Sequence, residues 1–230
     1  MTLHLYPNVE HDSPEWHDLR RGIVTASVVG RLITPATIKV ANNVDTRALT
    51  AELVVERITG WTDDNYVSYD MQRGHDDEPR AIKVYSEHWT NVTTCGFMVR
   101  DDWGFRIGYS PDGLTEDALG SELGCIEIKS RAPKKHLQTV LADEVPAENM
   151  AQIQCALLVS GRDWCDYISY SGGLALWPKR VYPDPRWQDA IVAAVAAFEE
   201  AAEQMQAAYT KAVAGLPMTE RTPDYSDIRF

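Results

Sequence analysis

The sequence lacks any run of about 18 apolar residues, which is the length that a membrane-spanning helix needs. Its N-terminus also lacks the basic and then apolar pattern of a secretory signal. Both absences predict a soluble cytoplasmic protein that makes no contact with a membrane. The length of 230 residues, of which 44% are hydrophobic, suits a single domain over residues 1–230.

Cysteine is scarce, and the sequence contains no C-x-x-C pair and no histidine at a spacing that would complete a zinc site. We therefore expect reduced, mostly buried thiols, and the same scatter argues against an iron–sulfur cluster. The histidines His75 and His88 also have no partner at metal-ligand spacing, so the sequence assigns them no role. The four cysteines are Cys95, Cys125, Cys155 and Cys165.

Basic residues are few: 22 Lys and Arg stand against 34 Asp and Glu, which gives a net charge of -12. Because neutralisation of phosphates supplies most non-specific affinity for DNA, composition alone argues against nucleic acid. A local basic groove can still bind DNA on an acidic protein. Two basic clusters qualify, Arg20 with Arg21, and Arg131 with Lys134, Lys135 and His136, although the second is also typical of a solvated loop.

Apolar periodicity and turn residues predict a mixture of helices and strands. Helices are expected over residues 13–22, 25–32, 45–60, 147–159 and 184–215, with another that carries Glu78 and runs through Trp89. Strands are expected over residues 97–99, 105–109, 125–129, 165–170 and 174–181, and a loop over 61–70. The sequence therefore predicts an α/β or α+β domain with a mixed central sheet flanked by helices.

One expected strand carries a carboxylate and an ammonium group on the same face. In the segment 124–129 the residues alternate, so Ile126 and Ile128 face the core while Glu127 and Lys129 share the other side. Taken alone, this Glu-x-Lys pattern is more typical of a solvent-facing cross-strand charge pair.

A turn upstream sharpens that pattern. The segment 110–113, Ser-Pro-Asp-Gly, has the composition of a β-turn, and an antiparallel return would bring Asp112 beside Glu127. Two carboxylates and a main-chain carbonyl, that of Ile128, are the hard oxygen ligands that Mg²⁺ prefers. Lys129 could stabilise the attacking hydroxide or the charge on the scissile phosphate. This is the PD-(D/E)xK nuclease pattern.

Four segments in the same order resemble the family of phage lambda exonuclease and the YqaJ-type viral recombinases. They are residues 16–27, 110–114, 127–129 and 150–154. The resemblance implies a restriction-endonuclease-like core. It also implies that Asp112 and Glu127 bind metal, that Lys129 is the catalytic lysine, and that Glu78 is an upstream helical acid near the metals.

The resemblance assigns further residues around the site. Gln154 matches the second glutamine of a helix that flanks the site, with Gln152 as its rival, and either could simply lie on a polar helix face. Arg20 and Ser27 match residues that hold a 5′-phosphate, as an arginine fork and a first helical turn would favour. The alternative is a surface charge and a helix-start residue. Met71 matches an apolar wedge between base pairs, or is a core methionine.

The implied activity is stepwise hydrolysis of the 5′-ended strand of linear duplex DNA, with two Mg²⁺ ions as cofactors and Mn²⁺ as a substitute. The products would be mononucleotides and a 3′ overhang. A homotrimeric ring and a single-strand annealing protein are the implied partners, besides DNA ends with a 5′-phosphate. The alternatives are another PD-(D/E)xK nuclease, such as an endonuclease or a repair or defence nuclease, and a non-catalytic DNA-end-binding subunit.

The sequence departs from the family pattern in two places. The stretch between Asp112 and Glu127 is longer and contains other acids that could compete for the metal, namely Glu116, Asp117 and Glu122. Pro79 follows Glu78 and could bend its helix and shift the acid.

Overall fold

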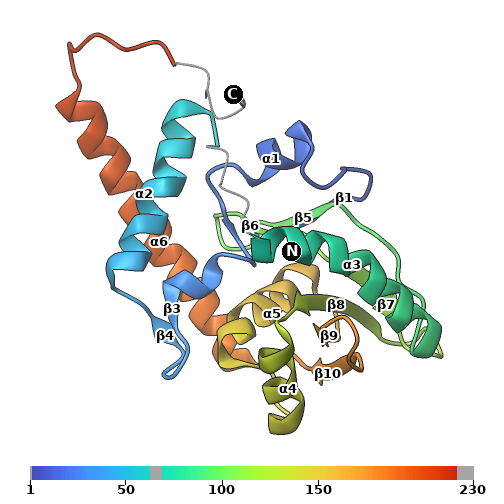
Figure 1. The fold of residues 1–230 in the computed structure, drawn as a ribbon. Coiled ribbons are helices and arrows are strands. Elements are labelled where there is room, and N and C mark those ends of the chain that lie inside the picture. The colour runs from blue at the N-terminus through green and yellow to red at the C-terminus, as the bar shows by residue number, and fades with distance from the viewer. Residues whose placement is uncertain (1, 63–68, 222–230) are drawn as a thin grey trace.

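Strands and helices alternate along residues 2–62 and 69–221, which the computed structural model describes (Figure 1). The helices are α1 (Pro14–Arg20), the 3-10 helix η1 (Val29–Leu32), α2 (Val44–Thr59), α3 (Tyr69–His88), α4 (Pro133–Ala142), α5 (Ala147–Ser160) and α6 (Pro185–Ala212). The strands are β1 (Leu3–Tyr6), β2 (Val24–Thr25), β3 (Ile33–Thr34), β4 (Lys39–Val40), β5 (Phe97–Arg100), β6 (Ile107–Tyr109), β7 (Gly113–Glu116), β8 (Leu123–Ser130), β9 (Trp164–Tyr170) and β10 (Trp177–Val181).

The described strands form two four-stranded mixed sheets and a small hairpin. One sheet has the order β10-β9-β8-β7, in which β8 and β9 run parallel and the outer pairs run antiparallel. The other has the order β1-β5-β6-β2, in which only β2 and β6 run parallel. The predicted α/β class and the mixed pairing are confirmed, while the single central sheet of the prediction is divided into two.

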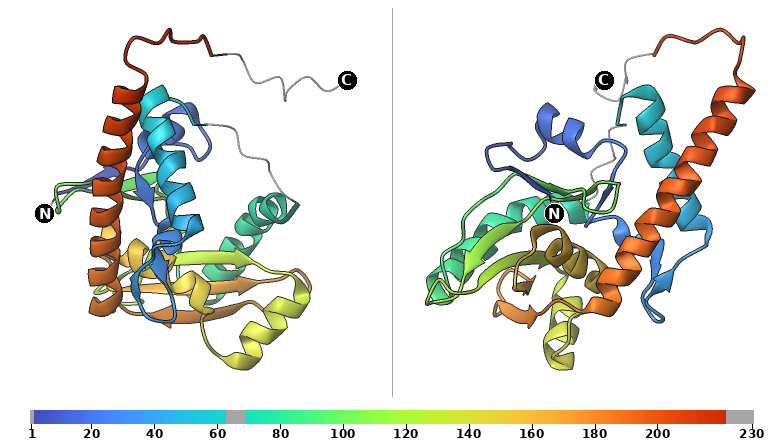
Figure 2. Two further views of the ribbon diagram at one scale, coloured as in Figure 1. Left: turned by 90° about the vertical axis from the view of Figure 1, so that its left-hand side faces the viewer. Right: turned by 180° about the vertical axis from the view of Figure 1, so that it is seen from behind.

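Helix α5 packs against both sheets, since it contacts β5 and β6 on one side and β9 on the other (Figure 2). Ile153, Cys155 and Leu157 are almost fully buried in the main core. A helix that is apolar on several sides belongs inside a protein. The position of α5 between the sheets explains why a short helix with few polar residues forms here.

Helix α3 covers the other face of the sheet that contains β8 (Figure 1). Ala81 and Tyr85 of α3 pack against Ile126, Ile128 and Ile168. The expectation that Ile126 and Ile128 face a core is confirmed. The strand is not half-buried, however, because helices cover both of its faces.

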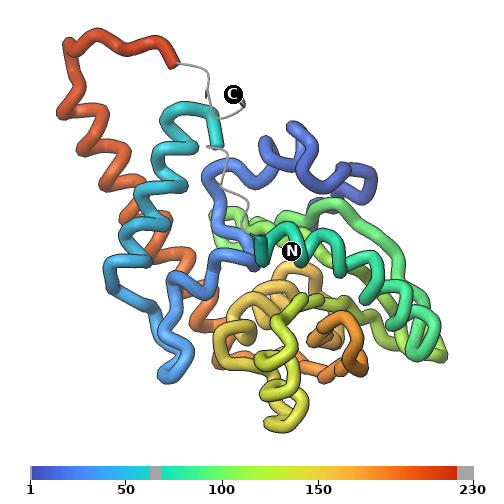
Figure 3. Tube along the Cα trace, in the orientation of Figure 1, coloured from blue at the N-terminus to red at the C-terminus, as the bar shows by residue number. Residues whose placement is uncertain are grey.

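Helices α2 and α6 lie side by side at one edge of the molecule (Figure 3). Arg57 forks onto Glu199 across this pair with distances of 2.7 and 2.8 Å, and its Nε donates to the carbonyl of Gly22. Arg57 thereby fixes the turn after α1, where Gly22 has a φ of 67°. The long α6 is therefore a structural support, as its apolar stripe predicts.

Several local predictions are wrong. The expected helix over 25–32 is a short strand followed by the 3-10 helix η1, because Val24 pairs with Ile107 of β6. Helix α2 begins at Val44, one residue before the predicted start, because the Asn43 side chain accepts from Thr46 N as the N-cap. Of the expected loop 61–70, residues 63–68 lie outside the described part, and residues 69–70 belong to α3.

Two further expectations, on membrane-spanning helices and on the cysteines, can be compared with the structure. No helix among the described residues is both long and apolar enough to cross a membrane. The cysteines Cys95, Cys125, Cys155 and Cys165 are all free and buried, as expected.

Candidate active site

The turn before β7 places Asp112 next to β8. The two strands pair antiparallel with Gly113 opposite Ile126, so the chain before Gly113 faces the strand at Glu127. The Asp112 Oδ2 accepts a hydrogen bond of 2.6 Å from the main-chain N–H of Ile128. The predicted antiparallel return is therefore present, and it brings Asp112 to the segment that contains Glu127.

Glu127, Lys129 and Gln152 form a closed triangle of polar contacts. Lys129 Nζ lies 2.7 Å from Glu127 Oε1 and donates to Gln152 Oε1 at 3.0 Å. Gln152 Nε2 in turn donates to the same Glu127 Oε1 at 2.6 Å. Glu127 is only 1% exposed, and its Oε2 has no hydrogen-bond partner among the described residues. A buried carboxylate oxygen without a partner is costly unless a ligand satisfies it.

Glu78 of α3 faces the same acids across the site. Burial raises the pKa of Glu78, and the charge of Glu127 raises it further, while His75 and Lys129 oppose the shift. Burial, together with Glu127 and Glu78, raises the pKa of Asp112 well above its ordinary value. Within the described part of the chain, these three carboxylates do not all lie within 4.8 Å of one another. Glu127 raises the pKa of both Glu78 and Asp112, as like charges that face one site do.

Helix α3 runs through Pro79 without ending, so the proline does not stop the helix that carries Glu78. The other acids of the β7–β8 connection also stay away from the site. Glu116 pairs with Leu123 at the far end of the hairpin, and Asp117 accepts from the main-chain N–H groups of Ser121 and Glu122. They therefore do not compete with Asp112 for a metal.

Gln154 does not reach the site, so its assignment there is wrong. Its Nε2 donates to the carbonyl of Tyr182 at 2.9 Å, and its Oε1 accepts from Asp184 N at 2.8 Å. Residues two apart on a helix point to opposite sides, since each residue turns by about 100°. Only one of the two glutamines of α5 can face β8, and it is Gln152.

We expect the two glutamines to separate activity from stability. Gln152→Ala removes the amide that holds Glu127, the predicted metal ligand, and should lower kcat by about 10- to 100-fold. Gln154→Ala removes two part-buried hydrogen bonds, to the Tyr182 carbonyl and from the Asp184 N–H, and should lower the free energy of unfolding by about 1–3 kcal/mol. Steady-state digestion of DNA and urea unfolding of both variants measure the two effects. The same loss of kcat in both variants would contradict the assignment.

Arg20 and Ser27 meet beside α1. Arg20 NH2 donates to Ser27 Oγ at 3.3 Å, and the Ser27 Oγ lies 3.0 Å from Thr25 Oγ1. The Arg20 guanidinium also lies 4.0 Å from the centre of the Trp16 ring. Burial lowers the pKa of Arg20 to about 10, so the side chain stays charged at neutral pH.

Trp16 connects this cluster to the turn that carries Asp112. Its Nε1 donates to Ser110 Oγ at 3.1 Å, and Ser110 Oγ donates to the carbonyl of Gly96 at 2.9 Å. The expectation that Ser27 lies in the first turn of a helix is wrong, because η1 begins at Val29 and has four residues. Any anion here would thus be held by the hydroxyl and guanidinium groups and not by a helix dipole.

The family model of the YqaJ-like viral recombinase domain matches residues 15–163, which is more than half of the chain. The chain belongs to the YqaJ-like viral recombinase family. The match begins in α1 and ends just before β9, so it includes Arg20, Asp112, Glu127, Lys129 and both glutamines of α5.

Solved structures agree with the YqaJ-like assignment. The alkaline exonuclease LHK-Exo from Laribacter hongkongensis is 30% identical, covers 89% of this chain and 100% of its own, and has a TM-score of 0.76. LHK-Exo in complex with dAMP gives 29% identity over the same shares of both chains and a TM-score of 0.77. A phage-related exonuclease from Haemophilus somnus 129PT, 14% identical with a TM-score of 0.62 over 84% of this chain and 99% of its own, shares the fold. No curated protein matches the chain.

Four other predicted residues of this YqaJ-like chain need a new description. Met71 lies in the first turn of α3 and is 47% exposed, which excludes the core-methionine interpretation. Lys134 and Lys135 belong to α4 and not to a loop. His136 is buried on α4, where its Nδ1 lies 2.8 Å from Ser169 Oγ of β9, so it is a packing residue.

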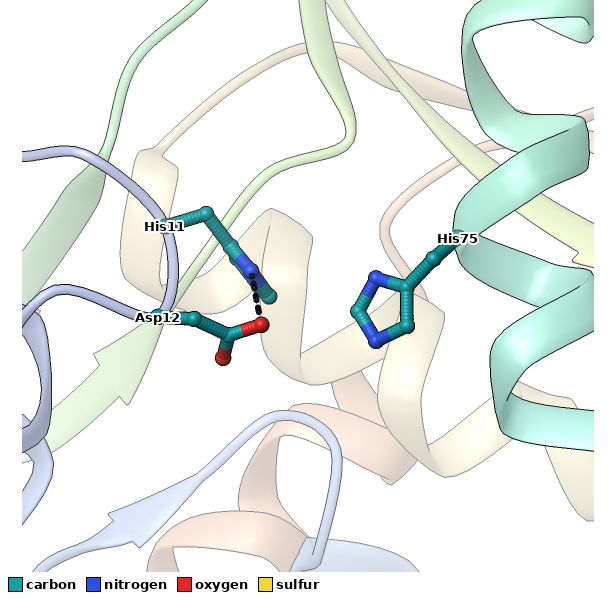
Figure 4. A group of neighbouring side chains, drawn as sticks. All are labelled: His11, Asp12 and His75. Atoms are coloured by element: carbon teal, nitrogen blue, oxygen red, sulfur yellow. Dashed lines mark ion pairs between the residues drawn. The ribbon is translucent and has the colours of Figure 1, made fainter. Parts of the chain in front are cut away.

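A second polar group lies between the N-terminal segment and α3 (Figure 4). His11 and Asp12 precede α1, and His75 projects toward them from α3. The possible metal-ligating atoms of all three lie within 4.8 Å of one another. Sequence patterns assigned His75 no role because His11 and Asp12 are distant from it in the chain, so no local spacing could reveal the group.

Proposed function

We propose that this chain is a divalent-metal-dependent exonuclease that digests the 5′-ended strand of linear duplex DNA. It would release mononucleotides and leave a 3′ single-stranded overhang. The observation that carries the proposal is the buried Glu127 carboxylate, which lies in the strand that Asp112 contacts and whose Oε2 has no hydrogen-bond partner in the described part of the chain. Membership of the YqaJ-like family and the likeness to an alkaline exonuclease support a nuclease, and the dAMP bound to LHK-Exo supports a mononucleotide product.

The residues present fit a magnesium site. Glu127 Oε2 is a buried oxygen that needs a partner, and Asp112 offers a second carboxylate. The N–H and C=O of one strand residue point to the same edge, so the Ile128 carbonyl faces the edge at which Asp112 accepts the Ile128 N–H. Such all-oxygen ligands suit Mg²⁺, with Mn²⁺ as a substitute. When bound, two such ions would activate water and neutralise the leaving oxygen.

The remaining side chains would position the metal ligands and stabilise negative charge. Gln152 holds Glu127 Oε1, which leaves Oε2 free for a ligand. Burial opposes the charge of Lys129, but Glu127 and Asp112 outweigh it and raise the pKa of Lys129 above its ordinary value. A charged lysine donates hydrogen bonds and stabilises negative charge, and it does not act as a base. Glu78 would complete the acidic side of the site.

Arg20 and Ser27 would bind the 5′-phosphate of the strand to be cut. A guanidinium beside two hydroxyl groups offers several donors to phosphate oxygens. Trp16 connects this pocket to the Asp112 turn, which would fix the distance between the terminal phosphate and the scissile bond. Met71, exposed at the start of α3, would contact the bases as an apolar wedge.

The proposal extends to the assembly. A homotrimeric ring around DNA would retain an acidic chain on its substrate, because topology replaces part of the electrostatic attraction. The 3′ overhang would be passed to a single-strand annealing protein. Residues 1–230 would act as one nuclease domain.

The test compares blunt linear duplexes with a 5′-phosphate or a 5′-hydroxyl and a covalently closed circle, all with Mg²⁺. We expect the phosphorylated end to be digested at least about tenfold faster, since hydrogen bonds to charged groups contribute roughly 1.5–3 kcal/mol. Arg20→Ala should abolish the preference. The neighbouring Arg21→Ala is the matched control, because Arg21 pairs with Asp18.

Each competing function has its own outcome. Cleavage of the circle at the same rate would indicate an endonuclease. Release of a label at the 3′ end before a label at the 5′ end would show that digestion proceeds in the 3′-to-5′ direction. Binding of ends without any product in Mg²⁺ or Mn²⁺ would indicate a non-catalytic DNA-end-binding subunit.

A further inference from the structure

The group formed by His11, Asp12 and His75 has the composition of a transition-metal site (Figure 4). Two imidazole nitrogens and one carboxylate oxygen are the donors that zinc and its neighbours accept, whereas Mg²⁺ prefers oxygen alone. All three residues are exposed, so the remaining coordination positions would be open to water.

The spacing suits a small ion. His11 Nδ1 lies 3.3 Å from Asp12 Oδ2. Two ligands that bind a tetrahedral zinc ion at about 2.0–2.1 Å are themselves roughly 3.3 Å apart. His75 completes the set within 4.8 Å, and its ring centre lies 5.8 Å from that of His11, so a modest movement of one side chain closes the triangle.

The backbone brings two adjacent side chains to one side. Neighbouring residues on an extended chain point to opposite sides. Asp12 adopts a φ of 61°, which is uncommon for a residue other than glycine, and this turn directs its carboxylate to the His11 ring. The His11 ring packs 4.3 Å from the Trp16 ring, between centres, which restricts its orientation.

We propose that His11, Asp12 and His75 bind one zinc-class divalent cation, which joins the N-terminal segment to α3. This site is separate from the oxygen-ligand site at Asp112 and Glu127. The cation would link two parts of the molecule that matter for the activity, since α1 carries Arg20 and α3 carries Glu78 one turn after His75. The proposal does not depend on the nuclease function.

The chain contains a matched comparison. His4 Nε2 lies 2.9 Å from Asp101 Oδ2, which is also an exposed histidine–aspartate pair. It belongs to no group of three possible ligands among residues 2–62 and 69–221. A second imidazole is thus the feature that separates the proposed site from an ordinary ion pair.

The experiment is calorimetric titration of the full chain with zinc chloride while Mg²⁺ is in large excess. An Asp112→Asn background weakens zinc binding at the other carboxylates, and the excess Mg²⁺ competes for those that remain. We expect one zinc ion per chain, a higher melting temperature with zinc, and affinity reduced at least about tenfold by either His11→Ala or His75→Ala. His4→Ala and His88→Ala are the controls and should bind zinc as the parent does.

Two results would overturn the proposal. One is the absence of zinc binding in the parent above the level of a His11→Ala and His75→Ala double variant. The other is equal loss of affinity in the His4→Ala control, which would indicate unspecific surface binding. Either result leaves the digestion of DNA in Mg²⁺ untouched, so a failure here does not bear on the proposed nuclease.

Discussion

Lys129→Met is expected to lower kcat by about 10²- to 10³-fold, which is the loss seen when one preorganised donor is removed from a transition state. The Nζ lies 2.7 Å from Glu127 Oε1, and the neighbouring acids keep it charged. It is thus placed to stabilise negative charge that develops next to Glu127. Methionine keeps a similar apolar stem, so the loss reports the ammonium group more than the packing.

Single-turnover digestion of a 5′-phosphorylated duplex measures this effect, with duplex affinity measured in parallel. Lys179→Met is the matched control, because Lys179 is also a sheet lysine in an ion pair, with Asp143 at 2.9 Å. The control should keep the parent's rate. If the Lys129→Met protein is folded and digests DNA at the parent's rate, Lys129 takes no part in the reaction.

Strand periodicity explains why the centre of the site could be predicted. A period of two places Glu127 and Lys129 on one face, whatever covers that face. The expected antiparallel return after Asp112 is present, because the chain reverses at residues 117–122 and pairs β7 with β8. Local geometry therefore sufficed for Asp112, Glu127 and Lys129.

Contacts between distant segments determined local structure and burial that sequence patterns could not predict. The segment around Ser27 has residues typical of a helix start, but pairing of β2 with β6 holds Val24 and Thr25 extended. Helix α4 begins at Pro133, and its N-cap residue Ala132 makes no side-chain hydrogen bond. The sequence therefore contains no capping residue that would predict the start of this helix. His136 is buried against β9, where Ser169, distant in sequence, is its hydrogen-bond partner.

The choice between the glutamines shows the same limit. Both lie on α5, and the sequence cannot say which side of a helix that is buried on several sides faces β8. The answer depends on the chain before α6, where Tyr182 and Asp184 bind Gln154. Contacts between segments distant in sequence thus determine the site beyond its central strand.

Asp112→Asn is expected to abolish digestion, by at least about 10³-fold, and at the same time to stabilise the metal-free protein. Asparagine keeps an oxygen that can accept the Ile128 N–H but loses the charge that a metal needs. Burial, Glu127 and Glu78 raise the pKa of Asp112 well above its ordinary 3.8, so the ionised carboxylate is unfavourable in the metal-free fold.

The direction of the pH dependence follows from that shift. A carboxyl group whose pKa is raised by folding favours the folded state at low pH, and this contribution is lost as pH rises from 3.8 through the raised value. The Asp112→Asn protein has no carboxyl group to ionise, so it keeps its stability as pH rises. Its free energy of unfolding should therefore exceed that of the parent by an amount that grows with pH above 3.8, to at least about 1 kcal/mol. Urea unfolding in a chelator at several pH values measures the difference.

Asp117→Asn provides a control with the opposite sign. Hydrogen bonds from the main-chain N–H groups of Glu122 and Ser121 lower the pKa of Asp117, so its contribution is present above the ordinary value and lost as pH falls. The Asp117→Asn protein should therefore be less stable than the parent at neutral pH and should digest DNA normally. If Asp112→Asn instead destabilised the metal-free fold at neutral pH, the three acids would not repel one another, and the need for a cation between them would disappear. Addition of Mg²⁺ should stabilise the parent and leave the Asp112→Asn protein nearly unchanged, because the ion neutralises the repulsion that the substitution has already removed.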